Sequence, residues 1–259
     1  MSNKFSLSVI LPTFREKKNL EIIIPEIIEK ISSLNYVLFE ILVVDDNSND
    51  GTIELIENLN KKYKNLRILV RNGPNSLPNS ILDGIKNSNN DFVMWLDADG
   101  SMPANEVRKL IEVQLKNFGS VVVGSRFVEG GGYKGTVLNE DNKIRKAIFN
   151  VYKSNDSVIA MLLSLLFNYL LSILSSVKVK DLTSGFIIGD KKMFNDECFL
   201  SANYGDYFVY LMKDLNHKNV PVLEVGYKCQ TRIYGVSKTG SSLMQLVKLG
   251  VPYIKAAIK

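Results

Sequence analysis

Two aspartates follow an apolar run near the middle of the chain. Residues 92–96 are apolar, and Asp97 and Asp99 come directly after them. A lone D-x-D pattern is most often a strand-to-turn boundary, because Asp and the following Gly100 favour turns. In extended geometry, however, residues i and i+2 point the same way, so both carboxylates could reach one divalent cation. Such hard oxygen ligands suit Mg²⁺ or Mn²⁺, which keep open positions for substrate phosphates.

Apolar runs alternate with helical patterns over the first half of the chain. The spacing predicts strands at 7–14 (stopped by Pro12), 39–52 with its terminal turn, 66–72, 91–99 and 120–127. It predicts helices at 19–31, 52–63, 80–88 and 105–117. Strands that alternate with helices indicate an α/β fold with a mostly parallel central sheet and helices on both faces. The continuously apolar strands fit a sheet that is buried on both faces.

Ligands of such sheets bind at the carboxyl ends of the strands. Asp45 and Asp46 end one predicted strand, Asp97 and Asp99 end another, and Arg126 ends a third. Two acid pairs and a basic residue at neighbouring strand ends favour a site for a metal and a phosphorylated ligand. There Asp46 could accept hydrogen bonds from a base or a ribose.

The composition narrows the class of protein. A chain of 259 residues fits one large α/β domain. Two cysteines, Cys198 and Cys229, are too few for a disulfide framework, and residues 1–7 are polar rather than signal-like, so we expect a cytosolic location. The one histidine, His217, lies in a segment typical of a surface loop, which argues against a catalytic triad or a histidine metal site.

The positive charge lies near the carboxyl terminus. Residues 207–259 contain eight Lys or Arg and two Asp or Glu, in a chain whose net charge is +5. A basic end suggests phosphate groups, an anionic membrane surface or nucleic acid, although it could be a solvated surface. A nucleic-acid partner is disfavoured, because the pattern contains no aromatic stacking platform.

Two segments have amphipathic patterns. Residues 157–177 are long enough to span a bilayer, but Ser164, Asn168, Ser172 and Ser176 form a polar stripe. We therefore expect an interfacial or buried helix. The segment 241–259 has a basic stripe and is expected to break near Pro252. This predicts a catalytic domain at 1–240 and a membrane- or partner-facing helix at 241–259; both segments could instead pack on the domain or on a second subunit.

Six stretches in order carry a resemblance to a known family. They read SVILPTFREKKNL, ILVVDDNSNDGT, WLDADGSMP, VVVGSRF, VKDLTSGF and RIYGVSKTG, between residues 8 and 240. The chain resembles the family 2 glycosyltransferases of the GT-A fold, in the branch that includes dolichol-phosphate mannosyltransferases and other polyprenol-phosphate glycosyltransferases. The resemblance covers nearly the whole chain.

The resemblance implies a role for each matching residue. The nucleotide pocket would contain Pro12, Glu16, Asp45 and Asp46. The metal would be bound by Asp97 and Asp99, with Ser101 beside them where the family commonly has Gln. The phosphate-facing cations would be Arg126, Arg145, Arg232 and Lys238, and Ser184 and Gly185 would line the acceptor side. Arginine suits this task because its planar fork pairs with two phosphate oxygens.

The sequence also departs from the family pattern. A glycine-rich stretch of the family reads SLP at 76–78, and Thr231 and Val236 replace acids. The substrates could therefore differ from those of the best-known members. The usual acidic segment near Tyr210 is absent, which leaves Asp206 as the nearest candidate for a general base. Asp206 could instead be an exposed aspartate in a turn. With Asp99 and Arg232 it completes the expected catalytic set.

These observations predict an inverting, metal-dependent glycosyltransferase on the cytosolic face of a membrane. It would move a sugar from a GDP- or UDP-linked donor to a polyprenyl phosphate such as dolichyl or undecaprenyl phosphate, with Mg²⁺ or Mn²⁺. An alternative of the same fold transfers the sugar to a hydroxyl of a surface polysaccharide or a lipid-linked glycan. A third reading is a non-catalytic nucleotide-sugar-binding protein, against which the complete D-x-D argues. The chain could also form a homo-oligomer.

Overall fold

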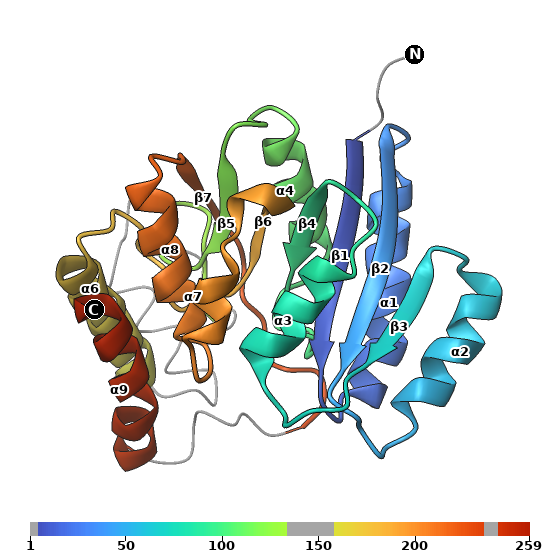
Figure 1. Ribbon diagram of the computed structural model, residues 1–259, viewed down its shortest axis with the longest axis horizontal. Coiled ribbons are helices and arrows are strands. Elements are labelled where there is room, and N and C mark those ends of the chain that lie inside the picture. The colour runs from blue at the N-terminus through green and yellow to red at the C-terminus, as the bar shows by residue number, and fades with distance from the viewer. Residues whose placement is uncertain (1–4, 134–157, 236–242) are drawn as a thin grey trace.

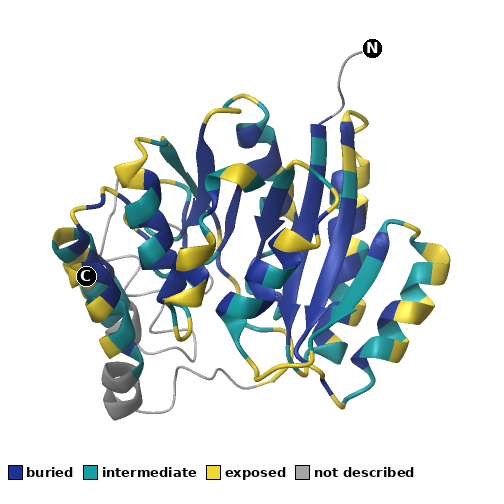
Figure 2. Cartoon of the chain, viewed as in Figure 1, coloured by how far each residue is buried: buried dark blue, intermediate teal, exposed yellow. Residues whose placement is uncertain are grey.

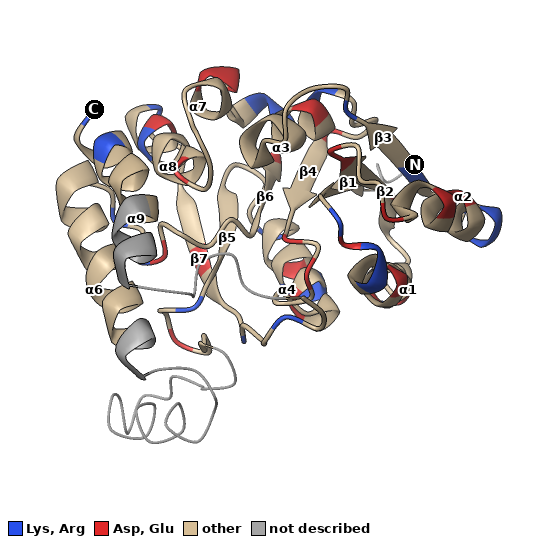
Figure 3. Ribbon diagram, turned by 90° about the horizontal axis from the view of Figure 1, so that it is seen from below, with Lys and Arg blue, Asp and Glu red and all other residues tan. Residues whose placement is uncertain are grey.

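The computed structural model describes residues 5–133, 158–235 and 243–259. A central sheet of seven strands runs through the described part of the chain, with helices on both faces (Figure 1). Helices α3, α7 and α8 cover one face, and α1 and α4 cover the other (Figure 3). This confirms the predicted α/β class with its mostly parallel sheet.

The strands are β1 (Phe5–Thr13), β2 (Val37–Asp45), β3 (Leu66–Val70), β4 (Phe92–Trp95), β5 (Val121–Ser125), β6 (Ile187–Asp190) and β7 (Val222–Gly226). The helices are α1 (Lys17–Ser32), α2 (Thr52–Lys62), α3 (Leu77–Lys86), α4 (Ala104–Gln114), α6 (Val158–Ser175), α7 (Asp196–Leu200), α8 (Tyr207–His217) and α9 (Leu243–Ile258). A short 3₁₀ turn, η1 (Lys191–Met193), follows β6. The sequence patterns did not predict β6, β7, α7 or α8.

The strand order is β3-β2-β1-β4-β6-β5-β7, and β6 alone among these strands runs antiparallel to its neighbours. Ile187, at the start of β6, pairs with Trp95 at the end of β4 and with Val123 in β5. Because β6 is reversed, the residues that precede it lie where its neighbours end. The segment 181–186 is thereby brought to the edge of the sheet that carries the aspartates.

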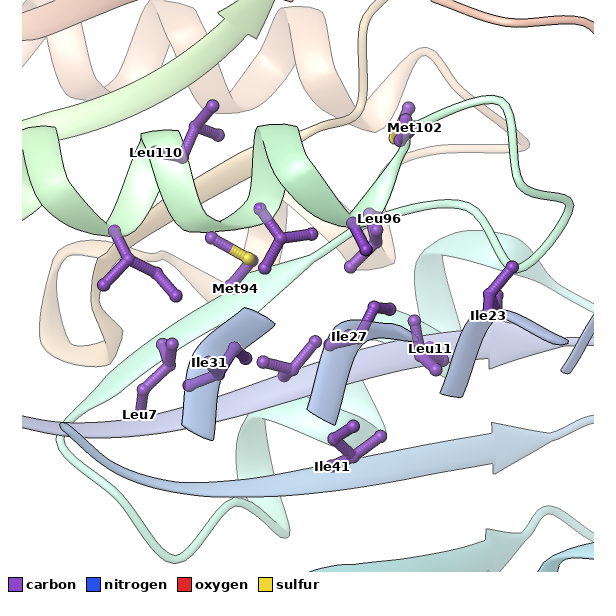
Figure 4. Packing of buried hydrophobic residues seen from close by; sticks show 14 of the residues in the cluster. Leu7, Leu11, Ile23, Ile27, Ile31, Ile41, Met94, Leu96, Met102 and Leu110 are labelled. Carbon is purple, nitrogen blue, oxygen red and sulfur yellow. The ribbon is translucent and has the colours of Figure 1, made fainter. Parts of the chain in front are cut away.

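Each face of the sheet has its own hydrophobic core. On one face Leu7, Leu11 and Met94 pack against Ile27 of α1 and Leu110 of α4 (Figure 4). On the other face the intervening strand residues pack against α3, α7 and α8. Alternate strand residues point to opposite faces, so one strand supplies both cores. The inner strands are accordingly buried along most of their length, whereas the edge strands β3 and β7 are mostly half-buried (Figure 2).

Two predictions about prolines are wrong, because neither Pro12 nor Pro252 ends its element. Strand β1 continues through Pro12 to Thr13 instead of stopping. Strand β4 pairs with β1 only as far as Ile10, so Pro12 has a ladder partner on the β2 side alone, and a missing N–H is tolerated there. Helix α9 likewise runs through Pro252 without a break. Its contacts with α6 and α8 hold it in place despite the hydrogen bond that proline removes.

Helix α6 lies beside α9 at the end of the molecule (Figures 1 and 3). Its polar stripe faces inward at Asn168, is half-buried at Ser164 and Ser172, and ends at the exposed Ser176. Asn168 is 1% exposed, whereas Tyr169 is 67% exposed. The Asn168 side chain donates to the hydroxyl of Thr183 (3.0 Å) and to the carbonyl of Ser164 (2.9 Å). The outer surface consists of five exposed apolar residues, here called the α6 apolar face: Leu162, Leu166, Tyr169, Leu170 and Ile173.

Candidate active site

Asp97 and Asp99 lie just beyond the end of β4. The strand ends at Trp95, so Asp99 sits in a turn rather than in the extended strand that the i, i+2 argument assumed. Gly100 follows with a φ of +81°, which glycine adopts freely. One oxygen of Asp99 accepts a hydrogen bond from the backbone N–H of Ser101 (2.9 Å). The turn therefore orients Asp99 through its own backbone.

The Asp97 carboxyl lies in an environment that disfavours its charge. Burial, and after it the negative charge of Asp99, raise the pKa of Asp97 to about 7. Arg232 and Arg126 act in the opposite direction. A buried carboxyl whose pKa is raised by burial and by a neighbouring acid marks a place where a cation is stabilising. This pair is the central feature of the candidate site.

Arg232 supplies a positive charge at that place. Its guanidinium lies 3.0 Å from Asp99 and 3.3 Å from Glu16. The segment that carries it is bound to the D-x-D turn by two backbone hydrogen bonds, from Gln230 to Ser101 (2.9 Å) and from Ile233 to Asp99 (3.1 Å). Three predicted residues from distant parts of the chain thus meet.

The neighbouring acids, Asp45 and Asp46, end β2. Asp46 pairs with Arg71 and accepts hydrogen bonds from the N–H of Ser76 (2.8 Å) and the hydroxyl of Ser80 (2.8 Å). Arg71 was not singled out from the sequence; it lies within the predicted strand 66–72 and directly follows the observed strand β3. These contacts hold the Asp46 carboxylate against the start of α3, on the β2 side of the site.

Asp45 differs from Asp46 in its surroundings. It is fully buried, and its two oxygens accept hydrogen bonds from the N–H (2.6 Å) and the hydroxyl (2.7 Å) of Ser48. These bonds shape the loop after β2. Pro12 is buried in β1 beside this loop, paired in register with Val44. Both residues are buried, so neither is exposed on the expected nucleotide side.

Arg126 follows β5 and forms a two-pronged ion pair with Asp181. Its Nε and Nη2 lie 2.8 Å and 2.7 Å from the two carboxylate oxygens. Arg126 also donates to Thr183 (2.7 Å), the same hydroxyl that Asn168 of α6 contacts. Asp181 belongs to the DLTSGF stretch, but no role was expected for it. This network joins α6 to the segment 181–185.

Ser184 and Gly185 lie before β6, at the same edge as the acids. The Ser184 hydroxyl donates to the carbonyl of Gly124 (2.5 Å), which ties the segment to β5. Gly185 has a φ of +68°, and a Cβ there would lie 3.2 Å from the hydroxyl of Tyr207. A close backbone turn therefore faces the D-x-D pair from the β6 side.

Asp206 is buried and accepts hydrogen bonds from the backbone N–H groups of Asn203 (3.1 Å) and Tyr204 (2.7 Å). It is thus no exposed turn aspartate, and its contacts are those of a residue that fixes a loop. Arg145 and Lys238 lie outside the described residues. Ser101 contributes its backbone to the turn.

Asp97 and Asp99 could hold a divalent cation whose remaining ligands come from a substrate. No group of three or more His, Cys, Asp or Glu within the described residues could enclose a metal. Two adjacent carboxylates, of which one is already paired with Arg232, leave the remaining positions to other oxygens. Such an open arrangement is typical of Mg²⁺ or Mn²⁺ on phosphates.

In the described parts of the chain, no helix combines the length and apolarity needed to cross a bilayer.

Comparison with known proteins establishes the class. The model of the family described as Glycosyl transferase family 2 matches residues 8–197. The chain belongs to this family, and its sheet and helices have the GT-A fold that the resemblance implied.

Two relatives carry the same name. A dolichol-phosphate mannosyltransferase from Pyrococcus furiosus is 38% identical over 125 residues, which is 48% of this chain and 34% of that protein. The dolichol-phosphate mannosyltransferase of Saccharomyces cerevisiae is 30% identical over 125 residues, or 48% of this chain and 46% of that protein. The chain matches less than half the length of either relative.

Solved structures share the architecture at low identity. Glucosyl-3-phosphoglycerate synthase from Mycobacterium tuberculosis, in complex with phosphoglyceric acid, superposes with a TM-score of 0.62 at 14% identity, covering 98% of this chain and 79% of that chain. The same enzyme was solved with Mn²⁺ and UDP. Mannosyl-3-phosphoglycerate synthase from Rubrobacter xylanophilus gives 0.58 at 18% identity, covering 98% and 73%. At these identities the likeness concerns the fold.

Proposed function

We propose that this chain transfers a sugar from a nucleotide-diphosphate donor to a polyprenyl phosphate, with inversion at the anomeric carbon. The observation that carries the proposal is the meeting of Arg232 with Glu16 and Asp99, within the electrostatic reach of Asp97, at the carboxyl edge of a family 2 fold. The two relatives named dolichol-phosphate mannosyltransferases support this acceptor class.

The donor would lie across the carboxyl ends of β2, β1 and β4. Asp46 and Pro12 are on the nucleoside side, and Asp97 and Asp99 are on the diphosphate side. Mg²⁺ or Mn²⁺, bound by Asp97 and Asp99, would neutralise charge on the departing diphosphate. Arg232 would stabilise the same charge, since its guanidinium is already held at the acids.

The acceptor chemistry follows from Asp206. A sugar hydroxyl must lose a proton as it attacks, and a positioned base contributes about 10²–10⁴-fold to that step. The Asp206 carboxylate is instead engaged by two backbone N–H groups. A phosphate monoester has a second pKa near 6, so it is largely a dianion at neutral pH and needs no base. This favours a phosphate acceptor over the hydroxyl alternative.

The transfer is then a single displacement. An oxygen of the acceptor phosphate forms a bond to the anomeric carbon, and the bond from that carbon to the donor's diphosphate breaks with its electron pair. The nucleoside diphosphate leaves, and no proton needs to move. Among the described cations, Arg232 is placed to stabilise the leaving group, and Arg126 belongs to the acceptor side, where Asp181 orients it.

A lipid acceptor requires a lipid surface. Residues 158–175 contain no charged side chain, and the α6 apolar face is exposed (Figure 3). Lys255 and Lys259 of the adjacent carboxyl-terminal segment are exposed as well. An apolar face beside cations fits the interface of an anionic membrane. We place the enzyme at such a surface as a peripheral protein on the cytosolic side.

A donor panel tests the function. GDP, UDP and their mannose and glucose conjugates are titrated with Mn²⁺, and release of free sugar is followed over hours. We expect one nucleotide series to bind. Asp97→Ala and Asp99→Ala should each lose the part of the nucleotide affinity that depends on Mn²⁺. Asp91→Ala, an exposed aspartate before β4, serves as the control. Unchanged nucleotide affinity in both site variants, or no binding by the unaltered chain, would contradict the proposal.

A further inference from the structure

The loop 201–206 is built to present one aromatic side chain. The carboxylate of Asp206 gathers the backbone N–H groups of Asn203 and Tyr204, which fixes the loop's backbone. Tyr204 is nevertheless 39% exposed. An ordered loop with a large exposed aromatic residue suits contact with a ligand, because little conformational entropy is lost on binding.

Three anchors fix where this loop lies. Tyr207 directly follows the loop, and its hydroxyl accepts a hydrogen bond from the indole N–H of Trp95 (3.0 Å). Trp95 lies two residues before Asp97 in the sequence. The same hydroxyl lies close to Gly185 before β6. From the other side, Tyr253 of α9 packs on the loop, since a Cβ added at Gly205 would lie 1.9 Å from its hydroxyl. The loop is thus held between β4, the start of β6 and α9.

The order of the strands along the sheet edge indicates which part of the donor would lie beside the loop 201–206. Asp46 is at the end of β2, the D-x-D pair is at the end of β4, and Gly185 precedes β6. A diphosphate at the D-x-D pair joins the nucleoside on the β2 side to the sugar on the other side. The sugar therefore lies toward β6, where the loop 201–206 is anchored.

The electrostatic surroundings of the Tyr204 phenol agree with this position. Burial, and after it the charge of Asp97, raise the pKa of Tyr204, with Arg232 opposing and Asp99 adding. The hydroxyl is accordingly within the field of the metal-site residues. It stays protonated at neutral pH and can donate a hydrogen bond.

We propose that Tyr204 contacts the glycosyl unit of the donor, with its ring against the sugar and its hydroxyl donating to a sugar oxygen. Tyr253 is a positioning residue that holds the loop through Gly205. This inference rests on the proposed function. Tyr204 lies outside all six matching stretches, so the resemblance assigned it no role.

The experiment separates sugar from nucleotide. Affinities for the preferred nucleoside diphosphate and for its sugar conjugate are measured with Mn²⁺ in Tyr204→Ala, Tyr204→Phe and the unaltered protein. We expect Tyr204→Ala to leave the diphosphate affinity within about twofold and to weaken the sugar conjugate about tenfold, as for one lost stacking and hydrogen-bonding residue. Tyr204→Phe should fall between. Tyr36→Phe, an exposed tyrosine before β2, is the control.

The outcomes distinguish the two claims. Equal weakening of both ligands, or of neither, overturns the assignment of Tyr204 while the proposed function stands. Failure of the unaltered chain to bind any nucleotide overturns the proposed function, and the assignment falls with it.

Tyr253 is tested through its coupling to Tyr204. Tyr253→Phe keeps the ring that packs against Phe167 (5.9 Å between centroids) and removes the hydroxyl at Gly205. We expect a raised donor KM with little change in kcat and in thermal stability. In a double variant with Tyr204→Ala the two effects should not add. Full additivity would overturn the positioning role.

Discussion

The guanidinium of Arg232 lies 3.0 Å from the carboxylate of Asp99, although the two residues are 133 positions apart in the sequence. Arg232 also reaches Glu16, so one cation links the D-x-D turn to the start of α1. A metal ion and Arg232 would therefore use the same acidic oxygens. In the proposed function, donor binding would divide those oxygens between the metal and the arginine.

Removal of Arg232 should affect metal binding and turnover in opposite directions. In Arg232→Ala, Asp97, Asp99 and Glu16 lose their nearest positive charge, so Mn²⁺ alone should bind more tightly. Sugar transfer should fall by more than about 100-fold, because charge on the leaving diphosphate is no longer stabilised. Titration of Mn²⁺ and steady-state rates measure the two effects. Arg108→Ala, an exposed arginine on α4, is the control; weaker Mn²⁺ binding in Arg232→Ala would contradict the competition.

The acceptor class is tested by comparing Asp206 with Arg232. Asp206→Asn keeps one carbonyl oxygen for the Tyr204 N–H and removes the base. For a phosphate acceptor we expect it to cost under about tenfold in rate, far less than Arg232→Ala, because no proton must be removed. The reverse order, with a large loss at Asp206 and a mild one at Arg232, would indicate a hydroxyl acceptor.

Metal affinity should depend on pH through Asp97. Its pKa is raised to about 7, so below that pH the carboxyl is largely protonated and a cation must displace the proton. Affinity for Mn²⁺ should therefore rise from pH 6 to pH 7 and level off above it. Calorimetry in buffers of different ionisation enthalpy measures the released proton. Asp97→Asn should lose this dependence, and a flat profile in the unaltered protein would refute the assignment.

The α6 apolar face should determine membrane binding. We expect the protein to float with anionic liposomes, and Leu166→Ser with Ile173→Ser to reduce the bound fraction, because the exposed apolar area is lost. Lys255→Glu and Lys259→Glu should weaken binding by about 1 kcal/mol each near the surface. Leu38→Ser, an exposed apolar residue on β2, is the matched control. Lack of flotation together with a dimer in light scattering would favour a subunit interface instead.

Gly185 should tolerate no side chain. Gly185→Ala places a Cβ at a φ of +68° and 3.2 Å from the Tyr207 hydroxyl, which accepts the Trp95 hydrogen bond. We expect a loss of about 1–2 kcal/mol in the free energy of unfolding, from the left-handed backbone alone. Chemical denaturation measures it. Gly119→Ala, where a Cβ meets nothing within 4 Å, is the control, and equal stability of the two variants would contradict the argument.

Local patterns were sufficient for the first half of the fold. Continuous apolar runs predicted the parallel strands, and helical spacing predicted α1, α2 and α4 close to their observed bounds. Asp46, Asp97 and Arg126 each follow the carboxyl end of a strand, as expected from those patterns. Strand direction alone determines which end of a parallel strand carries its loop.

The remaining features depend on contacts between distant segments. Strand β6 is short, and its antiparallel pairing with both β4 and β5 brings Gly185 to the site. The stripe of α6 has the same period whether its polar side faces water or protein; Thr183, 15 residues after Asn168, turns it inward. Periodicity encodes that a helix has two faces, whereas hydrogen-bond partners elsewhere in the chain select the face that is buried. Asp206 could also be named from the sequence, but its hydrogen bonds to the N–H groups of Asn203 and Tyr204 depend on the backbone conformation of the loop, which residue types alone do not give.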